Sequence, residues 1–299
     1  MNRFASAAAI IGISLSVIAI YIVYDFRYGI ELDSRAEYGP LNARMLTVDD
    51  NFDIPVEINL AAGLSYDADN DWFLVSTDEP HTLLPVHQAR VFVLDSTFTS
   101  ILRSHYVQSD SDLEGITTMG SGRIATLSEL GKLTFLQDDG ADGLTEIAHF
   151  KVFDEGGHKL GSLAYDHTNH HFYTAEKEGG KTIYKIDEQG KLLESFELRM
   201  PKTFAEAADE CFNFDDDYTI AGMQYIDEKL YIFSEAYSTV FVMEISTQQI
   251  TDVIGFPHLP ESSGMTIRNG KIYFIGDQED YLPAPKLHVA ALISQNPAR

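Results

Sequence analysis

The sequence predicts an all-β protein, a five-bladed β-propeller with four-stranded blades, preceded by one N-terminal transmembrane helix. Three observations carry this prediction. One four-strand pattern recurs five times after the first 50 residues, and such periods are typical of propeller blades. The 15 Tyr and 18 Phe, with many Val, Ile and Thr, favour strands because these side chains pack well on a pleated surface. An uncharged segment near the N-terminus is long enough to cross a bilayer.

The uncharged segment is residues 5–24 (ASAAAIIGISLSVIAIYIVY). As a helix rising about 1.5 Å per residue, it spans the hydrocarbon core of about 30 Å. It ends in bulky residues up to Tyr24 instead of a small-x-small cleavage site, which favours an uncleaved signal anchor over a signal peptide. Arg3 and the α-amino group precede it, whereas Asp25 and Arg27 nearly cancel after it, so the positive-inside rule favours residues 1–4 in the cytoplasm over the opposite topology. The protein is then a single-pass protein of the cell inner membrane with its body in the periplasm or exterior.

A linker is expected to follow the anchor. Residues 25–50 contain Tyr28, Gly29, Gly39 and Pro40 among scattered charges and show no clear periodicity. Residues 51–299 are then expected to form the propeller.

Each repeat begins with a strand hairpin. Its first strand starts at a small residue followed by alternating apolar positions, and a turn leads to a second apolar run. The start residues are Gly63 in GLSYD, Gly115 in GITTM, Ser162 in SLAYD, Gly222 in GMQYID and Gly264 in GMTIRN. The second runs are WFLVST, RIATLS, HFYTAE, KLYIFS and KIYFIG.

A third strand follows each hairpin, and the first four copies continue into a fourth. The third strands begin near Val91, Lys132, Thr182, Val240 and Lys286, and the fourth near Phe98, Leu144, Leu192 and Gln249. The fifth copy runs out of chain, so residues 53–58 (DIPVEI) are expected to supply its outer strand, close the ring and remove an open sheet edge.

A β-sandwich is the alternative fold. It would account for many strands, but it does not explain why they are grouped in fours with a matching first hairpin.

Charge and cysteine content exclude several functions. The 21 Lys and Arg against 46 Asp and Glu leave a net charge of -25, which repels nucleic-acid phosphates, so no nucleic acid is expected as a partner. A single cysteine allows neither an intramolecular disulfide nor a cysteine zinc cluster.

Acidic residues recur where the second strand of each hairpin ends. In an antiparallel hairpin this end returns beside the start of the first strand, where two further acids stand. The predicted result is a ring of carboxylates at one mouth of the central channel. Its members are Asp78, Glu79, Glu129, Glu176, Glu235 and Asp277 at the hairpin ends, and Glu114 and Glu261 beside the first strands.

Two interpretations of this ring stay open. Ca²⁺ accepts six to eight oxygens in irregular geometry, so carboxylates, carbonyls and waters of several blades could bind it. Alternatively, the acids terminate strands and accept hydrogen bonds from neighbouring blades, and they repeat only because the blades do.

The motifs GLSYD, DLEGI, GSLAYD, IAGMQY and SGMTI, in this order behind an N-terminal anchor, resemble the SdiA-regulated (YjiK-like) family. The resemblance covers roughly residues 55–293. It implies a five-bladed propeller on a membrane anchor, with a calcium site and no established biochemical activity.

Carried over by motif, the resemblance implies that Glu114 and Gly115 are the Glu-Gly pair of the second blade and Glu176 the acid that ends the third blade's hairpin. Where the third blade of the family usually has Phe-Glu-Gly, this chain has Leu160, Gly161 and Ser162, and Ala61 and Ala62 stand where a polar residue is common in the first blade. These departures weaken the calcium site without affecting the fold.

Two functions are weighed. The first is a non-enzymatic, extracytoplasmic binding or scaffolding propeller that takes a small ligand or a protein at one face. The second is a metal-dependent hydrolase of phosphoesters or lactones with its cation at the channel mouth. Holding a phosphoester requires basic residues, and only Lys159 and Lys177 stand near this mouth in sequence, so binding is preferred. His167, His170 and His171, near Asp166, are expected in a hairpin turn.

Overall fold

The computed structural model describes residues 44–291 with internal gaps. The gaps are residues 59, 79–88, 109–111, 141–142, 154–157, 178–180, 200–218, 236, 257–258, 260–261 and 277–285. The predicted anchor, residues 5–24, lies outside this part of the chain. Within the described part, no helix has the length and apolar character needed to cross a membrane.

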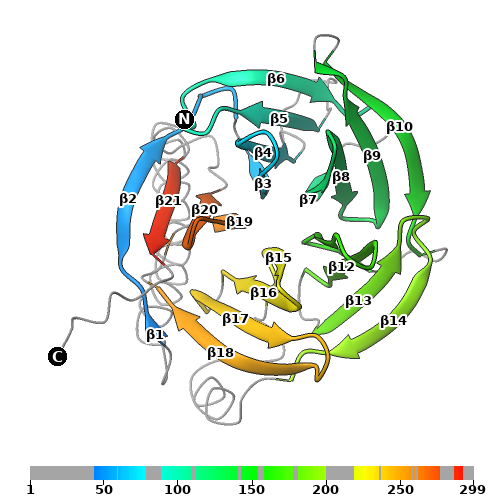
Figure 1. Ribbon diagram of the computed structural model, residues 1–299, viewed down its shortest axis with the longest axis vertical. Helices are drawn as coiled ribbons and strands as arrows, with labels where there is room; N and C mark the ends of the chain where they lie inside the picture. Colours follow the sequence, from blue (N-terminus) through cyan, green and yellow to red (C-terminus); the bar gives the residue numbers. More distant parts are fainter. Residues whose placement is uncertain are drawn as a thin grey trace, which may run out of the picture.

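Five antiparallel sheets are arranged in a ring, as predicted (Figure 1). The first blade has β3 (Ala61–Asp67), β4 (Trp72–Thr77), β5 (Arg90–Leu94) and β6 (Ile101–Tyr106). The second has β7 (Leu113–Gly120), β8 (Arg123–Ser128), β9 (Lys132–Asp138) and β10 (Leu144–Lys151), and the third β11 (Ala164–Asp166), β12 (His171–Ala175), β13 (Thr182–Asp187) and β14 (Leu192–Glu197). The fourth has β15 (Gly222–Ile226), β16 (Lys229–Ser234), β17 (Thr239–Glu244) and β18 (Gln249–Gly255), and the fifth β19 (Ser262–Arg268), β20 (Lys271–Gly276) and β21 (Lys286–Ala291).

The fifth blade takes its outer strand from the N-terminal side, which closes the ring. This strand is β2 (Val48–Asp53), antiparallel to β21, and the short β1 (Arg44–Met45) runs parallel to β18. The predicted closing strand, residues 53–58, was wrong. Pro55 lacks the N–H that a ladder needs, and its carbonyl accepts a turn hydrogen bond from Ile58 N at 3.0 Å. Because β2 begins at Val48, the propeller includes residues before residue 51, where it was expected to begin.

A second difference lies in the first blade, where the fourth strand begins at Ile101 instead of near Phe98. Phe98 has a positive φ of 63° and occupies the turn before the strand, where its ring packs 4.0 Å from Phe73. The apolar character of Phe98 therefore reflects core packing in a turn.

The repeated small residue is explained by how closely the inner strands approach one another around the axis. A Cβ on Gly63 would lie 2.7 Å from the carbonyl oxygen of Glu114 in the next blade, and one on Gly264 would lie 2.7 Å from Leu64 N. Real Cβ atoms do not approach so closely. In the third blade the residue that needs to lack a Cβ is Gly161, because a Cβ there would lie 2.8 Å from the Ile220 carbonyl oxygen.

The axis is closed by apolar side chains, one from each blade at the position after the start residue. These five residues, which we call the plug, are Leu64, Ile116, Leu163, Met223 and Met265, and the space among them is about 10 Å³. That is too small to hold an ordered water comfortably. The two mouths of the ring are therefore separate chambers.

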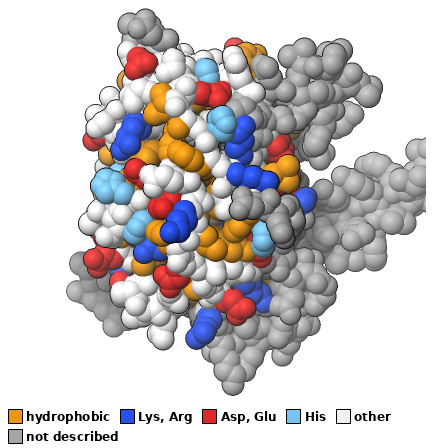
Figure 2. Space-filling view, turned by 90° about the vertical axis from the view of Figure 1, so that its right-hand side faces the viewer, with side chains coloured by type: hydrophobic (Ala, Val, Ile, Leu, Met, Phe, Trp, Pro, Cys, Tyr) orange, Lys and Arg blue, Asp and Glu red, His pale blue; other side chains and the backbone are white. Residues whose placement is uncertain are grey.

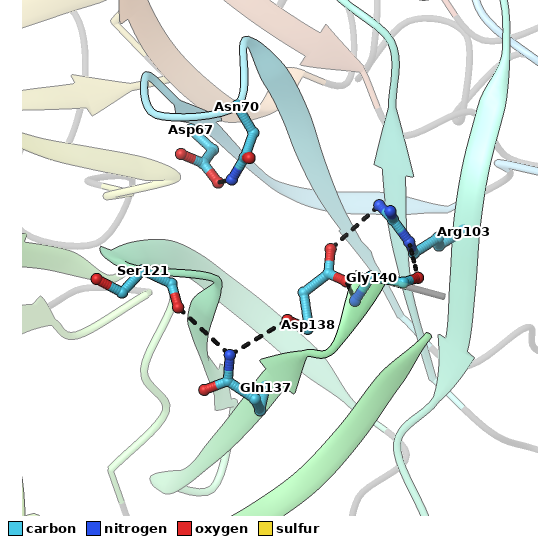
Figure 3. A network of polar contacts seen from close by, with 7 residues as sticks. All are labelled: Asp67, Asn70, Arg103, Ser121, Gln137, Asp138 and Gly140. Atoms are coloured by element: carbon cyan, nitrogen blue, oxygen red, sulfur yellow. Dashed lines mark hydrogen bonds and ion pairs between the residues drawn. The ribbon is translucent and has the colours of Figure 1, made fainter. Parts of the chain in front are cut away.

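Neighbouring blades are also joined near the rim (Figure 3). Arg103 in β6 forms an ion pair with Asp138 in β9 at 3.1 Å and donates from Nε to the Gly140 carbonyl at 3.0 Å. Its guanidinium also lies 4.6 Å from the Trp72 ring centroid. Because the Asp138 side chain is only 6% exposed, this pair is less screened by solvent than a surface pair, and breaking it would leave a buried charge uncompensated.

The outer strands carry charges of both signs. Figure 2 shows acidic, basic and histidine side chains interspersed over one side of the molecule, with hydrophobic side chains between them. In β10 exposed and half-buried positions alternate, and Glu146 and Lys151 stand on this strand. Charges on outer strands oppose edge-to-edge pairing between molecules.

Candidate metal centre

One mouth of the ring, which we call the acid mouth, is lined by the inner-strand positions that precede the start residues. Side chains two residues apart on a strand share a face, so these positions point to the axis like the plug residues. They are Ala62, Glu114, Gly161, Ala221 and Ser263. With Asp78, Lys177 and Glu235 they enclose a cavity of about 240 Å³.

Three carboxylates meet at the acid mouth. Asp78 follows β4, Asp112 precedes β7, and Glu114 lies within β7. One oxygen from each lies within 4.8 Å of the others. Glu114 is buried, whereas Asp78 and Asp112 are half-buried. We call these three residues the carboxylate group. Its members come from two adjacent blades.

Two lysines of the third blade reach this mouth. Lys177 Nζ forms an ion pair with Glu114 Oε1, and Lys159 Nζ lies 2.9 Å from Glu129 Oε1. A backbone hydrogen bond from Lys177 N to the Lys159 carbonyl, 2.7 Å long, holds the two segments together. The two lysines that the sequence placed nearest to this mouth therefore each form an ion pair with a carboxylate.

The pKa values show that negative charge remains in excess. Burial, the hydrogen bond with Glu129 and the nearby charges of Asp78 and Glu114 raise the pKa of Asp112 to about 8. Burial also raises the pKa of Glu114 to about 7, although the Lys177 ammonium opposes the shift. Burial would raise the pKa of Glu129 as well, but the hydrogen bonds with Lys159 and Asp112 lower it on balance. Asp112 therefore keeps its proton near neutral pH and donates it to Glu129.

Comparison with known proteins places the chain. Residues 46–251, more than half of the chain, match the family model described as SdiA-regulated. This chain belongs to the SdiA-regulated family. The resemblance noted from the motifs is thereby confirmed. No curated protein matches the chain in sequence.

Solved structures show the fold alone. The SdiA-regulated chain is similar to glutaminyl cyclase from Myxococcus xanthus, with 14% identity, a TM-score of 0.56 and coverage of 83% of this chain and 97% of that one. A nidogen/laminin complex matches with 11% identity, 73% and 72% coverage and a TM-score of 0.49. BamB from Moraxella catarrhalis matches with 13% identity, 73% and 61% coverage and a TM-score of 0.37.

The other acids predicted for this mouth do not all lie there. Glu235 lines the acid mouth with Glu114. Glu176 instead accepts a hydrogen bond from the Tyr184 hydroxyl at 2.7 Å and contacts His158 Nδ1 at 3.1 Å. Successive side chains of a strand point to opposite faces, so Lys177 faces the cavity and Glu176 faces away. Glu79, Asp277 and Glu261 lie outside the described residues.

Sequence reasoning missed Asp112. The signal was present, because Asp112 stands two residues before Glu114 in DLEGI and alternate residues of an extended segment share a face. Two of the three histidines lie as expected: residues 167–170, with His167 and His170 among them, form the turn between β11 and β12. His171 was wrongly expected in this turn, because it begins β12 and pairs with Asp166. The Asp166 carboxylate accepts bonds from Thr168 N and Asn169 N, both within that turn.

The spacing of the carboxylate group is compatible with a hard cation. Ca²⁺ binds oxygens at about 2.3–2.6 Å, so ligand oxygens on opposite sides of the ion lie up to about 5 Å apart. The spacing of 4.8 Å or less meets this limit. The remaining ligands would be carbonyls, waters or Glu235, which lines the same cavity.

Proposed function

We propose that this SdiA-regulated propeller is a non-enzymatic binding or scaffolding protein that holds Ca²⁺ at Asp78, Asp112 and Glu114. The observation that carries the proposal is the convergence of these three carboxylates within 4.8 Å. Residues 5–24 anchor the protein in the cell inner membrane, and the propeller presents a small-ligand or protein site in the periplasm or exterior.

The protonation of the carboxylate group supports a cation. With Lys177 already beside Glu114, Asp112 and Glu114 still have raised pKa values. A divalent ion would replace the protons as the balancing charge. Ca²⁺ fits better than Mg²⁺, because residues from two blades supply an irregular set of oxygens and Mg²⁺ demands near-ideal octahedral geometry.

The residues at the acid mouth favour a structural role for the metal ion over a catalytic role in hydrolysis. A phosphoester needs basic groups to hold its anion, and among the described residues lining the acid mouth only Lys177 is basic. That lysine is paired with Glu114. The likeness to a glutaminyl cyclase shows a shared fold and does not carry activity over.

Calorimetry on the full-length, chelator-stripped protein in detergent tests the site. We expect saturable Ca²⁺ binding, weaker Mg²⁺ binding, and loss of at least about tenfold in Ca²⁺ affinity in Asp112→Asn and in Glu114→Gln. Glu176→Gln is the matched control because its carboxylate faces away from the acid mouth, and it should bind like the wild type. Absence of binding at millimolar Ca²⁺ would contradict the proposal. It would show that Lys159 and Lys177 balance the carboxylate charge at the acid mouth without a metal ion.

The non-enzymatic part has its own test. We expect no turnover on panels of phosphoesters and lactones with Ca²⁺ present. Reproducible calcium-dependent turnover that disappears in Glu114→Gln would establish the hydrolase instead.

A further inference from the structure

The mouth opposite the acid mouth is a larger chamber, which we call the tyrosine funnel. Its wall is formed by the inner-strand positions two residues beyond the plug, namely Tyr66, Thr118, Tyr165, Tyr225 and Ile267. Its floor is the apolar plug, including Leu64, Met223 and Met265. The volume is about 490 Å³, within the range of about 300–1,000 Å³ typical of small-molecule sites.

Each of the three tyrosine hydroxyls is bonded to a carboxylate. The Tyr66 hydroxyl donates to Asp71 at 2.7 Å, the Tyr165 hydroxyl donates to Glu188 at 2.5 Å, and Tyr225 is hydrogen-bonded to Asp166. These bonds fix the ring orientations, and donation to an anion raises the electron density of a phenol ring.

The tyrosines also stay neutral at physiological pH. Burial, followed by the bonded carboxylates, raises the pKa of Tyr66 and of Tyr165 above the ordinary value. Burial and Asp166 raise the pKa of Tyr225 to about 12. The half-buried rings of Tyr66 and Tyr225 therefore present negative π-faces at the funnel wall, whereas Tyr165 is only 3% exposed and its ring packs 4.8 Å from Phe172.

The charges at the funnel are negative on balance. Among the described residues, its lining contains Asp67 and Asp69 and one residue with a permanently charged basic side chain, Arg268. Arg268 is already neutralised, because its Nη2 lies 2.5 Å from Asp71 and its Nη1 donates to the Ser96 carbonyl at 3.0 Å. Burial lowers the pKa of His167, which also lines the funnel, so this imidazole is uncharged at neutral pH.

One cation is already held by aromatic faces here. The Arg268 guanidinium lies 5.0 Å from the Tyr66 ring centroid and 5.3 Å from that of Phe73. Attraction of a cation by these rings is therefore a feature of this mouth.

We propose that the tyrosine funnel binds a small organic cation, a protonated or quaternary amine carried on an apolar body. The ammonium group lies against the half-buried rings of Tyr66 and Tyr225 near Asp69, and the apolar body rests on Leu64, Met223 and Met265 of the plug. Cation–π attraction and negative charge both select against anions. Because the plug closes the axis, this site is independent of the carboxylate group and of Ca²⁺.

The test uses benzyltrimethylammonium as the probe, with benzyl alcohol and phenylacetate as neutral and anionic counterparts. Calorimetry on the full-length protein should show saturable binding of the cation with a dissociation constant of about 1 mM or lower, and no binding of the counterparts. The affinity should be the same with and without Ca²⁺. Equal binding of the neutral compound, or no binding of the cation up to 10-fold this concentration, would overturn the proposal.

Variants separate the ring from the hydroxyl. Tyr225→Phe keeps the π-face and should bind within about twofold of the wild type, whereas Tyr225→Leu should lose about fivefold or more. Equal losses in both variants would contradict the cation–π assignment. Tyr225 also stacks on Tyr173 at 5.9 Å, so Tyr225→Leu is compared only if its thermal midpoint is retained.

A surface variant provides the second measurement. Asp69 is exposed, so Asp69→Asn should fold normally and weaken cation binding about threefold, by removing one attractive charge. Glu57→Gln, an exposed acid in the turn after β2, is the matched control and should bind like the wild type. Unchanged affinity in Asp69→Asn would show that charge does not contribute to recognition at this mouth and would overturn the proposal.

Discussion

Lys177 in the third blade forms an ion pair with Glu114 in the second blade across the acid mouth. The Glu114 side chain is 5% exposed and the lysine side chain 35%. Glu114 is also a member of the carboxylate group. A bound cation and the lysine ammonium therefore compete for the same carboxylate.

This competition predicts that Lys177→Met increases Ca²⁺ affinity by about tenfold, because one competing positive charge is removed from the site. Calorimetry at low ionic strength measures the change. Lys159→Met is the control, since Lys159 pairs with Glu129 outside the carboxylate group, and it should have a smaller effect. Weaker Ca²⁺ binding in a folded Lys177→Met protein would mean that the lysine organises the site.

Stability without divalent ions should fall as pH rises from about 5 to about 8. The pKa values of Asp112 and Glu114 are raised from 3.8 and 4.5 to about 8 and about 7, so in this window the folded chain holds more protons than the unfolded chain. Burial of His167 and His171 lowers their pKa values and acts in the opposite sense. The free energy of unfolding should therefore be measured against pH by chemical denaturation in chelator, for the wild type and for the double variant Asp112→Asn, Glu114→Gln. The decrease with pH should be smaller in the variant. An equal slope in both proteins would contradict the raised pKa values.

Asp112→Asn should separate metal binding from folding. At pH 6 Asp112 is protonated, and an amide retains a donor for Glu129, so the free energy of unfolding in chelator should change by less than about 1 kcal/mol. Denaturant titration measures this. Ca²⁺, which stabilises the wild type by binding the folded state, should give little stabilisation of the variant. A loss of several kcal/mol in chelator would show that Asp112 has a structural role.

Gly115→Ala should destabilise the protein by about 2 kcal/mol or more, because its Cβ would lie 2.7 Å from Leu163 Cβ in the next blade. Denaturant unfolding gives the free energy. Ser162→Ala is the matched control at the equivalent position of the third blade, where a side chain is already accommodated and the buried hydroxyl has no hydrogen-bond partner among the described residues. The control should be close to neutral, and similar losses in both variants would contradict the close-approach explanation.

The repeat made much of the fold predictable. Leu144, Leu192 and Gln249 were identified correctly as the starts of outer strands. The two failures share a cause. Around Phe98 and residues 53–58, apolar residues were assigned to strands, although they serve turns that insert side chains into the core. Local pattern does not distinguish a strand residue from a turn residue whose side chain is buried.

The candidate site was predictable only in part. Asp78, Glu114 and Glu235 were expected at one mouth, and all three line its cavity, because antiparallel pairing returns each hairpin end to its start. Glu176 was expected with them but faces Tyr184 and His158. A shift of one residue at a strand end moves a side chain to the opposite face of the sheet. The number of residues between an acid and the start residue of its blade therefore does not show which face its side chain lies on.

The sequence by itself determined the number of blades, the order of their strands and the acidity of one mouth, because periodic apolar positions and turns encode pairing locally. Only the tertiary structure decided which carboxylates meet, which lysines neutralise them, and that an apolar plug separates the acid mouth from the tyrosine funnel. Those relationships join residues of different blades. Their distances depend on how the blades pack around the axis, which the alternation within any one strand does not specify.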